Sequence, residues 1–158
     1  MPNIKHQFKL CQGTQVWNQW RRENATTLPN LAKASLCKAN LGGANLYRAN
    51  LKNVDFFGAD LTRSILVKAD LRKVDFSAAI LCRANLSEAD LRKANFFRAV
   101  LTEAAFYKAD LRGADLSGAD ISNANFLDAN LDKTIFSTPS GWPLTQIEDF
   151  ELRGAIFQ

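Results

Sequence analysis

Large hydrophobic residues recur at every fifth position from Leu31 to Phe136, over about two-thirds of the chain. All 22 of these central positions hold a large apolar residue: fifteen are Leu, six are Phe and one is Ile121. Ala stands two residues before the center in seventeen of the 22 repeats, and Asn or Asp stands one residue before it in sixteen. Such self-similarity at a fixed period predicts a stack of structural repeats.

A period of five matches neither the 3.6-residue helix nor the two-residue strand, so the chain must turn a corner in each repeat. Larger side chains recur at a second period of 20 residues. Val54 and Val74, which replace Ala, are 20 residues apart. The central residues Phe56, Phe76, Phe96 and Phe136 share one column at this interval, with Leu36 and Leu116 at its other places, and Phe106 and Phe126 form a second column. Because 20 residues contain four repeats, we expect four sides per coil and an internal, continuous column of Phe rings.

The repeat resembles the pentapeptide-repeat protein family over residues 29 to 138, in one uninterrupted frame. The resemblance implies an all-β solenoid, a right-handed four-sided parallel β-helix. It also implies that the central and minus-two residues point inward and that the other three residues of each repeat point outward. This agrees with the number of sides derived from the 20-residue spacing.

The two ends of the chain lack the repeat. We predict an N-terminal helical cap over residues 1–28, with Trp17 and Trp20 facing the first coil and Arg21 and Arg22 outside. The segment Trp-Asn-x-Trp-Arg also resembles the start of cyanobacterial family members. Residues 139–158 predict a C-terminal insertion and cap, with turn formers at 138–143, a short helix at 144–150, and coiling resumed at Leu152 and Phe157 in a frame shifted by one.

Composition offers little for catalysis. The only histidine, His6, falls in a start that we expect to be poorly structured, and no motif predicts a catalytic site, a cofactor or a metal. We interpret the eight Asp residues at minus-one positions as a requirement of the repeat. Three separated cysteines fit reduced thiols. With no apolar leader and no membrane span, the expected compartment is the cytoplasm.

One side of the predicted coil is basic. It is centered on Leu31 and the residues that follow at intervals of 20, and it carries a candidate anion-binding set: Lys52, Arg72, Lys73, Arg92, Lys93 and Arg112. Such a ladder could bind phosphates or an acidic partner. Alternatively, Asp70, Asp90 and Asp110 lie on the same side and can neutralise it. Net charge is only +4, so we do not expect tight DNA binding.

Apolar residues occupy outward positions on the next sides. This candidate partner patch consists of Tyr47, Ile65, Val67, Ile80, Val100, Tyr107 and Leu127. Contiguous exposed apolar surface marks partner sites, whereas single exposed apolar residues are ordinary, so both interpretations stay open.

The favoured function is a non-catalytic rigid protein-interaction module or scaffold with an unidentified protein partner. The alternative is binding of nucleic acid or another anionic surface along the basic side. The resemblance also implies a third reading, because some family members mimic DNA with an acidic surface and bind topoisomerases. Residues 31–136 hold fifteen Lys and Arg but only four acidic residues outside minus-one positions, which is the opposite balance. Because both ends are covered, we expect a monomer.

Overall fold

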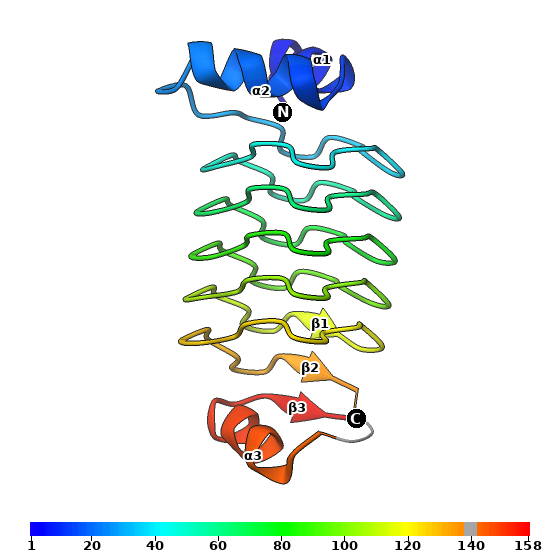
Figure 1. Ribbon diagram of the computed structural model, residues 1–158, viewed down its shortest axis with the longest axis vertical. Coiled ribbons are helices and arrows are strands. Elements are labelled where there is room, and N and C mark those ends of the chain that lie inside the picture. The colour runs from blue at the N-terminus through cyan, green and yellow to red at the C-terminus, as the bar shows by residue number, and fades with distance from the viewer. Residues whose placement is uncertain (138–141) are drawn as a thin grey trace.

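The computed structural model describes residues 1–137 and 142–158. It is an elongated stack of coils with helices at both ends (Figure 1). The elements in chain order are α1 (Ile4–Cys11), α2 (Thr14–Glu23), β1 (Asp115–Leu116), β2 (Ile135–Phe136), α3 (Leu144–Leu152) and β3 (Ile156–Phe157). The predicted turn formers at 138–141 and the boundary at 138 lie outside the described residues. No helix in the described part of the chain has the length and apolar character needed to cross a bilayer.

Each coil contains 20 residues. Seventeen isolated parallel bridges join residues 20 apart, from Asn30 with Asn50 to Asp110 with Asn130, and β1 pairs with β2 at the same interval. In most repeats only the minus-one residue is bridged, because the turn begins one residue after the center. The predicted 20-residue coil is therefore confirmed, although it consists mainly of single bridges and contains few regular strands.

A tight turn connects neighbouring sides of the coil. In the first repeat the backbone N–H of Ala34 donates to the carbonyl of Leu31 at 2.9 Å. The residue two after the center adopts a left-handed conformation, and seventeen non-glycine residues do so along the stack. These turns place the minus-one side chain at the middle of a face. The central side chain points inward, and the two residues after it lie at the corner. We name the faces after their first central residues: the Leu31, Leu36, Leu41 and Leu46 faces.

The six central phenylalanines form a buried aromatic ladder, and each is at most 5% exposed. Consecutive rings on one face stack with centroids 4.8 to 5.2 Å apart. The ladder crosses from Phe96 on the Leu36 face to Phe106 on the opposite Leu46 face, then returns from Phe126 to Phe136, through edge contacts of 5.9 Å. The rings are internal, as predicted, but their contact path uses two columns because Leu116 interrupts the first.

Helix α2 lies against the first coil. Trp17 is fully buried, and its Nε1 donates to the carbonyl of Asn45 at 2.8 Å. The Asn18 side chain accepts from the N–H of Asn45 at 2.8 Å and donates to the carbonyl of Gly43 at 2.9 Å. These side chains supply hydrogen bonds that a preceding coil would otherwise supply to the Leu46 face.

Two expectations for the N-terminal segment are wrong. Arg21 does not point outward: it is 5% exposed, and its guanidinium donates to the carbonyls of Thr27 at 2.7 Å and Tyr47 at 3.1 Å. His6 does not lie in an unstructured start, because α1 includes it and its Nδ1 accepts a hydrogen bond from the N–H of Asn30 at 3.0 Å. Tertiary contacts with the first coil fix both side chains.

The chain resumes coiling at its other end. Strand β3 pairs with β2 at an interval of 21 residues, and the Phe157 ring stacks on Phe136 with centroids 5.7 Å apart, which confirms the shifted frame at Phe157. Leu152 was predicted as a second inward residue, and this is wrong: it is the last residue of α3 and is 88% exposed. Phe150 occupies the interior, in contact with the rings of Phe126 and Phe136.

Candidate interaction surfaces

The Asn and Asp residues at minus-one positions are structural. In each of the sixteen repeats that have one, the side-chain oxygen accepts a hydrogen bond from the backbone N–H two residues later. This Asx bond anchors the corner turn. The eight Asp residues therefore anchor the turns of the repeat.

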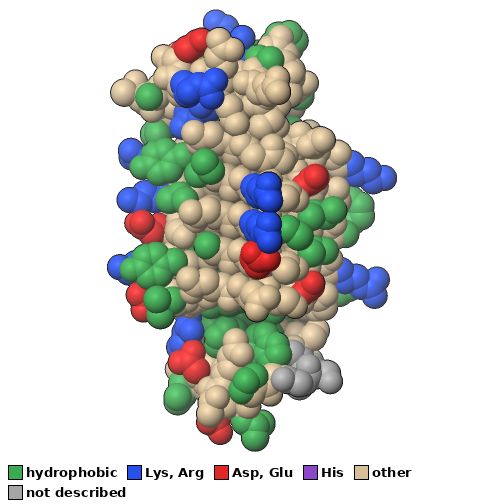
Figure 2. Space-filling view, in the orientation of Figure 1, with side chains coloured by type: hydrophobic (Ala, Val, Ile, Leu, Met, Phe, Trp, Pro, Cys, Tyr) green, Lys and Arg blue, Asp and Glu red, His purple; other side chains and the backbone are tan. Residues whose placement is uncertain are grey.

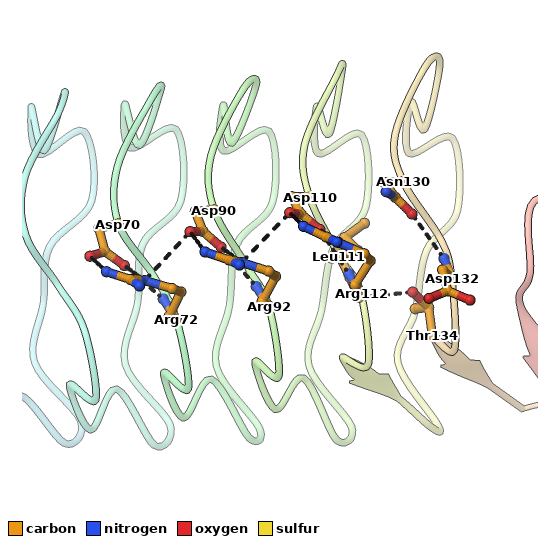
Figure 3. A network of polar contacts seen from close by, with 10 residues as sticks. All are labelled: Asp70, Arg72, Asp90, Arg92, Asp110, Leu111, Arg112, Asn130, Asp132 and Thr134. Carbon is orange, nitrogen blue, oxygen red and sulfur yellow. Dashed lines mark hydrogen bonds and ion pairs between the residues drawn. The ribbon is translucent and has the colours of Figure 1, made fainter.

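On the Leu31 face, Arg and Asp side chains alternate along the stack (Figure 3). Arg72 donates to both carboxylate oxygens of Asp70, at 2.7 and 2.6 Å, and its Nε lies 3.4 Å from Asp90 in the next coil. Arg92 and Arg112 repeat the pairing with Asp90 and Asp110. Three of the six candidate anion-binding residues thus already hold carboxylates.

The ion pairs shift the titration of this face. Hydrogen bonds from Arg72 and Arg112 lower the pKa values of Asp70 and Asp110 below their ordinary value of 3.8. The same contacts raise the pKa values of the two guanidinium groups. Both partners stay charged around neutral pH, so the ladder has little net charge to offer a polyanion.

The other candidate cations on this face are Lys52, Lys73 and Lys93. Within the described residues none of them forms an ion pair, and Lys73 and Lys93 are exposed at the same corner of neighbouring coils. Lys73 and Lys93 therefore keep their positive charges in a column beside the neutralised Arg–Asp pairs. The basic side is therefore weaker as a phosphate ladder than the count of Lys and Arg suggests.

The seven candidate patch residues lie at three positions around the coil. Ile80 and Val100 occupy the middle of the Leu41 face, where they bridge each other, and Ile65 occupies the middle of the Leu46 face. The remaining four follow the corner between the Leu46 and Leu31 faces: Tyr47, Val67, Tyr107 and Leu127. Ile65 and Ile80 are each 41% exposed. The structure thus presents apolar strips on adjoining faces.

A charged column separates these strips at the corner between the Leu41 and Leu46 faces. It consists of Arg63, Arg83 and Glu103 in successive coils, and Arg83 donates to both oxygens of Glu103 at 2.9 and 3.0 Å. Arg63 forms no ion pair with any described residue. A hollow of about 300 Å³ follows this corner. Figure 2 shows hydrophobic side chains on both flanks of such a charged column.

The charged column was not among the predicted site residues. The signal was available, because Gly43, Arg63, Arg83 and Glu103 succeed one another at intervals of 20 residues. Placing them at the corner between two apolar faces required knowing which residues of the repeat make the turn.

Groups suited to catalysis or metal binding are scarce in the described part of the chain. No cluster of three or more His, Cys, Asp or Glu residues there is placed to hold a metal ion. Burial and the nearby charge of Arg21 lower the pKa of His6. The neutral imidazole then accepts the Asn30 hydrogen bond, which is a structural role at the first coil.

The coils, their 20-residue interval and the inward Leu, Phe and Ala residues define a β-helix built from five-residue repeats. The family model for pentapeptide repeats matches eight copies, over residues 30–63, 69–104 and 99–137. The chain therefore belongs to the pentapeptide-repeat family, and its fold is a right-handed β-helix.

One solved structure supports the same assignment, and a second belongs to the same family. The pentapeptide repeat protein Rfr23 from the cyanobacterium Cyanothece 51142 is 34% identical, with a TM-score of 0.58 over 59% of this chain and 64% of that one. HetL, a pentapeptide repeat protein from Nostoc sp. strain PCC 7120 involved in heterocyst differentiation regulation, is 32% identical, with a TM-score of 0.27 over 70% of this chain and 62% of that one. This chain thus spans slightly less than two-thirds of each relative. No functionally curated protein matches it.

Proposed function

We propose that this chain is a non-catalytic protein-interaction module that binds a protein partner across the Leu41 and Leu46 faces. The observation that carries the proposal is the location of the minus-one positions that hold neither Asn nor Asp. Four of the ten minus-one positions on these two faces are apolar, and all four lie in the middle coils: Ile65, Ile80, Val100 and Ala105. On the other two faces, the departures are Ser35 and Ile135, at opposite ends of the stack.

Each apolar replacement removes the Asx hydrogen bond of its turn. In the described structure, the backbone N–H groups two residues later have no side-chain acceptor of this kind: those of Val67, Cys82, Thr102 and Tyr107. The exchange gives up a turn anchor and leaves Ile65 and Ile80 partly exposed. Selection for folding alone favours the Asx residue, so a partner-binding role explains the departure.

The surface has the composition of a partner site. Apolar side chains flank the hollow on both faces, and Tyr47 and Tyr107 extend along the next corner. Aromatic residues and Arg are enriched at protein interfaces, and Arg63 forms no direct ion pair with a described residue. The rigid stack would hold these groups in place before binding, which lowers the entropic cost of association.

The alternative, binding of nucleic acid along the Leu31 face, has weaker support because Asp70, Asp90 and Asp110 occupy its arginines. A DNA-mimicking role has weaker support still, since net charge is +4. Salt separates the classes: phosphate binding weakens steeply as salt increases, whereas an apolar protein interface does not.

Restoring the repeat on the patch tests the proposal. The variant Ile65→Asn, Ile80→Asn, Val100→Asn should fold at least as well as the wild type, because it regains three Asx bonds and adds no charge. Used as bait in an extract of the source organism, it should lose the proteins that the wild type retains. Ser35→Asn restores the repeat at a distant position and should retain them. The proposal is wrong if the triple variant captures the same proteins as the wild type.

A further inference from the structure

The most exposed large hydrophobic side chains of the described structure lie at the two ends of the stack. At the N-terminal end, Met1, Ile4 and Phe8 are 104%, 79% and 65% exposed. At the C-terminal end, Leu144 and Leu152 of α3 are 75% and 88% exposed. All five are more exposed than any large hydrophobic residue on the coils. The end helices therefore cover the coils with their inner surfaces and present apolar outer surfaces.

The N-terminal end is basic. Residues 1–22 contain four Lys and Arg residues and no Asp or Glu. Arg21 is buried, but Lys5 and Lys9 lie one helical turn apart on α1 and form no ion pair with any described residue. They line a hollow of about 530 Å³ together with Ile4, Phe8 and Trp20. This end thus combines a concave apolar surface with two free positive charges.

The C-terminal end is acidic. Helix α3 carries three acidic residues, and one of them, Asp149, pairs with Arg153 at 3.0 Å. The other two, Glu148 and Glu151, are exposed and have no ion-pair partner among the described residues. Together with Leu152 they line a second hollow of about 440 Å³. The second end therefore combines a protruding apolar side chain with two free negative charges.

We propose that the N-terminal end of one copy of this chain binds the C-terminal end of a second copy. Lys5 and Lys9 would face Glu148 and Glu151, since both pairs span about one helical turn. Phe8 and Leu152 would pack against the opposite hollows. Because the stack of coils holds the two ends apart (Figure 1), these surfaces can meet only between copies.

Such a contact is heterologous, because it joins two different surfaces. Since these surfaces lie at opposite ends of the stack, the copies would form an open, end-to-end row. This replaces the monomer expected from the sequence: the helices stop direct pairing of coil edges, and their outer surfaces form the interface. Two short helices bury little area, so the contact is a weak one. Association should become visible at roughly 0.1 mM in low salt.

Sedimentation velocity from ~0.01 to ~1 mM protein tests the proposal. At ~0.05 M salt the mean mass should increase with concentration, and ~0.5 M salt should reverse the increase. Two charge variants, K5E/K9E and E148K/E151K, should each self-associate at least about tenfold more weakly. Because their ends are then complementary to each other, an equimolar mixture of the two should regain the association.

A matched control is K73E/K93E, which makes the same charge change on the Leu31 face and should associate like the wild type. Circular dichroism confirms that each exposed variant is folded. The proposal is overturned if the wild type stays monomeric at ~1 mM in low salt, if K5E/K9E associates as strongly as the wild type, or if the mixture does not recover. A monomer that binds phosphatidylserine vesicles through Lys5 and Lys9 would also overturn it, in favour of a lipid surface.

Discussion

The coils and the two ends of the molecule satisfy similar backbone groups in different ways. Within the coils, the N–H of Leu51 donates to the carbonyl of Asp70, and every coil repeats this contact. At the N-terminal end, Trp17, Asn18 and Arg21 supply side-chain hydrogen bonds to the first coil. At the C-terminal end, the Arg153 guanidinium donates to the carbonyls of Phe126 and Ala129 at 2.6 and 2.7 Å.

This difference shows what a repeat can and cannot encode. A coil meets a copy of itself, so one five-residue rule specifies all its contacts, and stability comes from neighbour-to-neighbour packing. An end meets no copy, so each of its contacts needs a particular side chain. The N-terminal cover is also partial: in the described structure, the N–H groups of Ser35 and Asn40 on the Leu36 and Leu41 faces have no protein acceptor.

The largest expected effect is in the core of the coils. Phe76 is fully buried between the rings of Phe56 and Phe96, 5.2 and 5.0 Å away. Phe76→Ala should leave a cavity in the middle of the stack and lower the free energy of unfolding by about 3–5 kcal/mol, measured with denaturant. Phe57→Ala removes a half-exposed ring one residue after a center and should cost much less. A loss of under ~1 kcal/mol for Phe76→Ala would contradict the four-sided register.

The coils can be predicted from the sequence more fully than the two ends can. The coil interval could be read from Val54, Val74 and the central phenylalanines, because stacked positions have the same volume requirement. Buried Arg21 could not be predicted, since its position depends on where the carbonyls of Thr27 and Tyr47 lie. The five-residue spacing from Leu152 to Phe157 imitates a repeat and predicts an inward side chain, but Leu152 points outward because the local chain is helical.

The candidate surfaces show the same limit. Pairing of Arg72 with Asp70 follows from two residues in one repeat, so the sequence already allowed a neutralised basic side. The separation of Ile65 from Ile80 by the Arg63, Arg83 and Glu103 column depends on the path around a corner. Spacing along the chain shows which residues stack, but the arrangement around the coil requires the turn geometry.

At the N-terminal end we expect a smaller effect from Asn18. Its side chain bonds both Gly43 and Asn45 of the first coil. Asn18→Ala leaves two backbone groups without their partners and should cost about 1–3 kcal/mol. Hydrogen exchange of the Asn45 amide should accelerate in the variant. Gln19→Ala, next to it but exposed, should change stability by less than ~0.5 kcal/mol. Equal losses for the two variants would show that the Asn18 contacts contribute nothing specific.

Within the coils, one backbone substitution should increase stability. Ala78 is exposed and adopts a left-handed conformation with φ of 54°, in a column that carries Gly at 58 and 118. Ala78→Gly removes strain of about 1–2 kcal/mol but adds flexibility to the unfolded chain, so the net gain should be about 0.5 kcal/mol. Ala32→Gly, at a turn position without positive φ, should instead destabilise the protein. Loss of stability in Ala78→Gly would show that the repeat turn imposes no strain on alanine.

The smallest expected effect tests whether the Arg–Asp ladder adds to the stability of the coils. The Arg72 and Arg112 guanidinium groups hold the pKa values of Asp70 and Asp110 below 3.8. A carboxyl with a lowered pKa in the folded state stabilises the protein above its unfolded value, and this contribution is lost as pH falls through the folded value. The pH range in which this stabilising contribution is lost therefore lies below about pH 4.

Asn is a close replacement because it keeps the Asx bond, as in the eight repeats that already have Asn at minus-one. Asp70→Asn with Asp110→Asn should lower stability at pH 7 by less than about 1 kcal/mol, since these pairs are partly exposed. That difference from the wild type should vanish as pH falls from ~4.5 to ~2.5. Asp55→Asn removes a carboxylate that forms no ion pair with a described residue and serves as the control. A difference that persists unchanged at low pH would mean that shape, and not charge, distinguishes Asp from Asn on the Leu31 face.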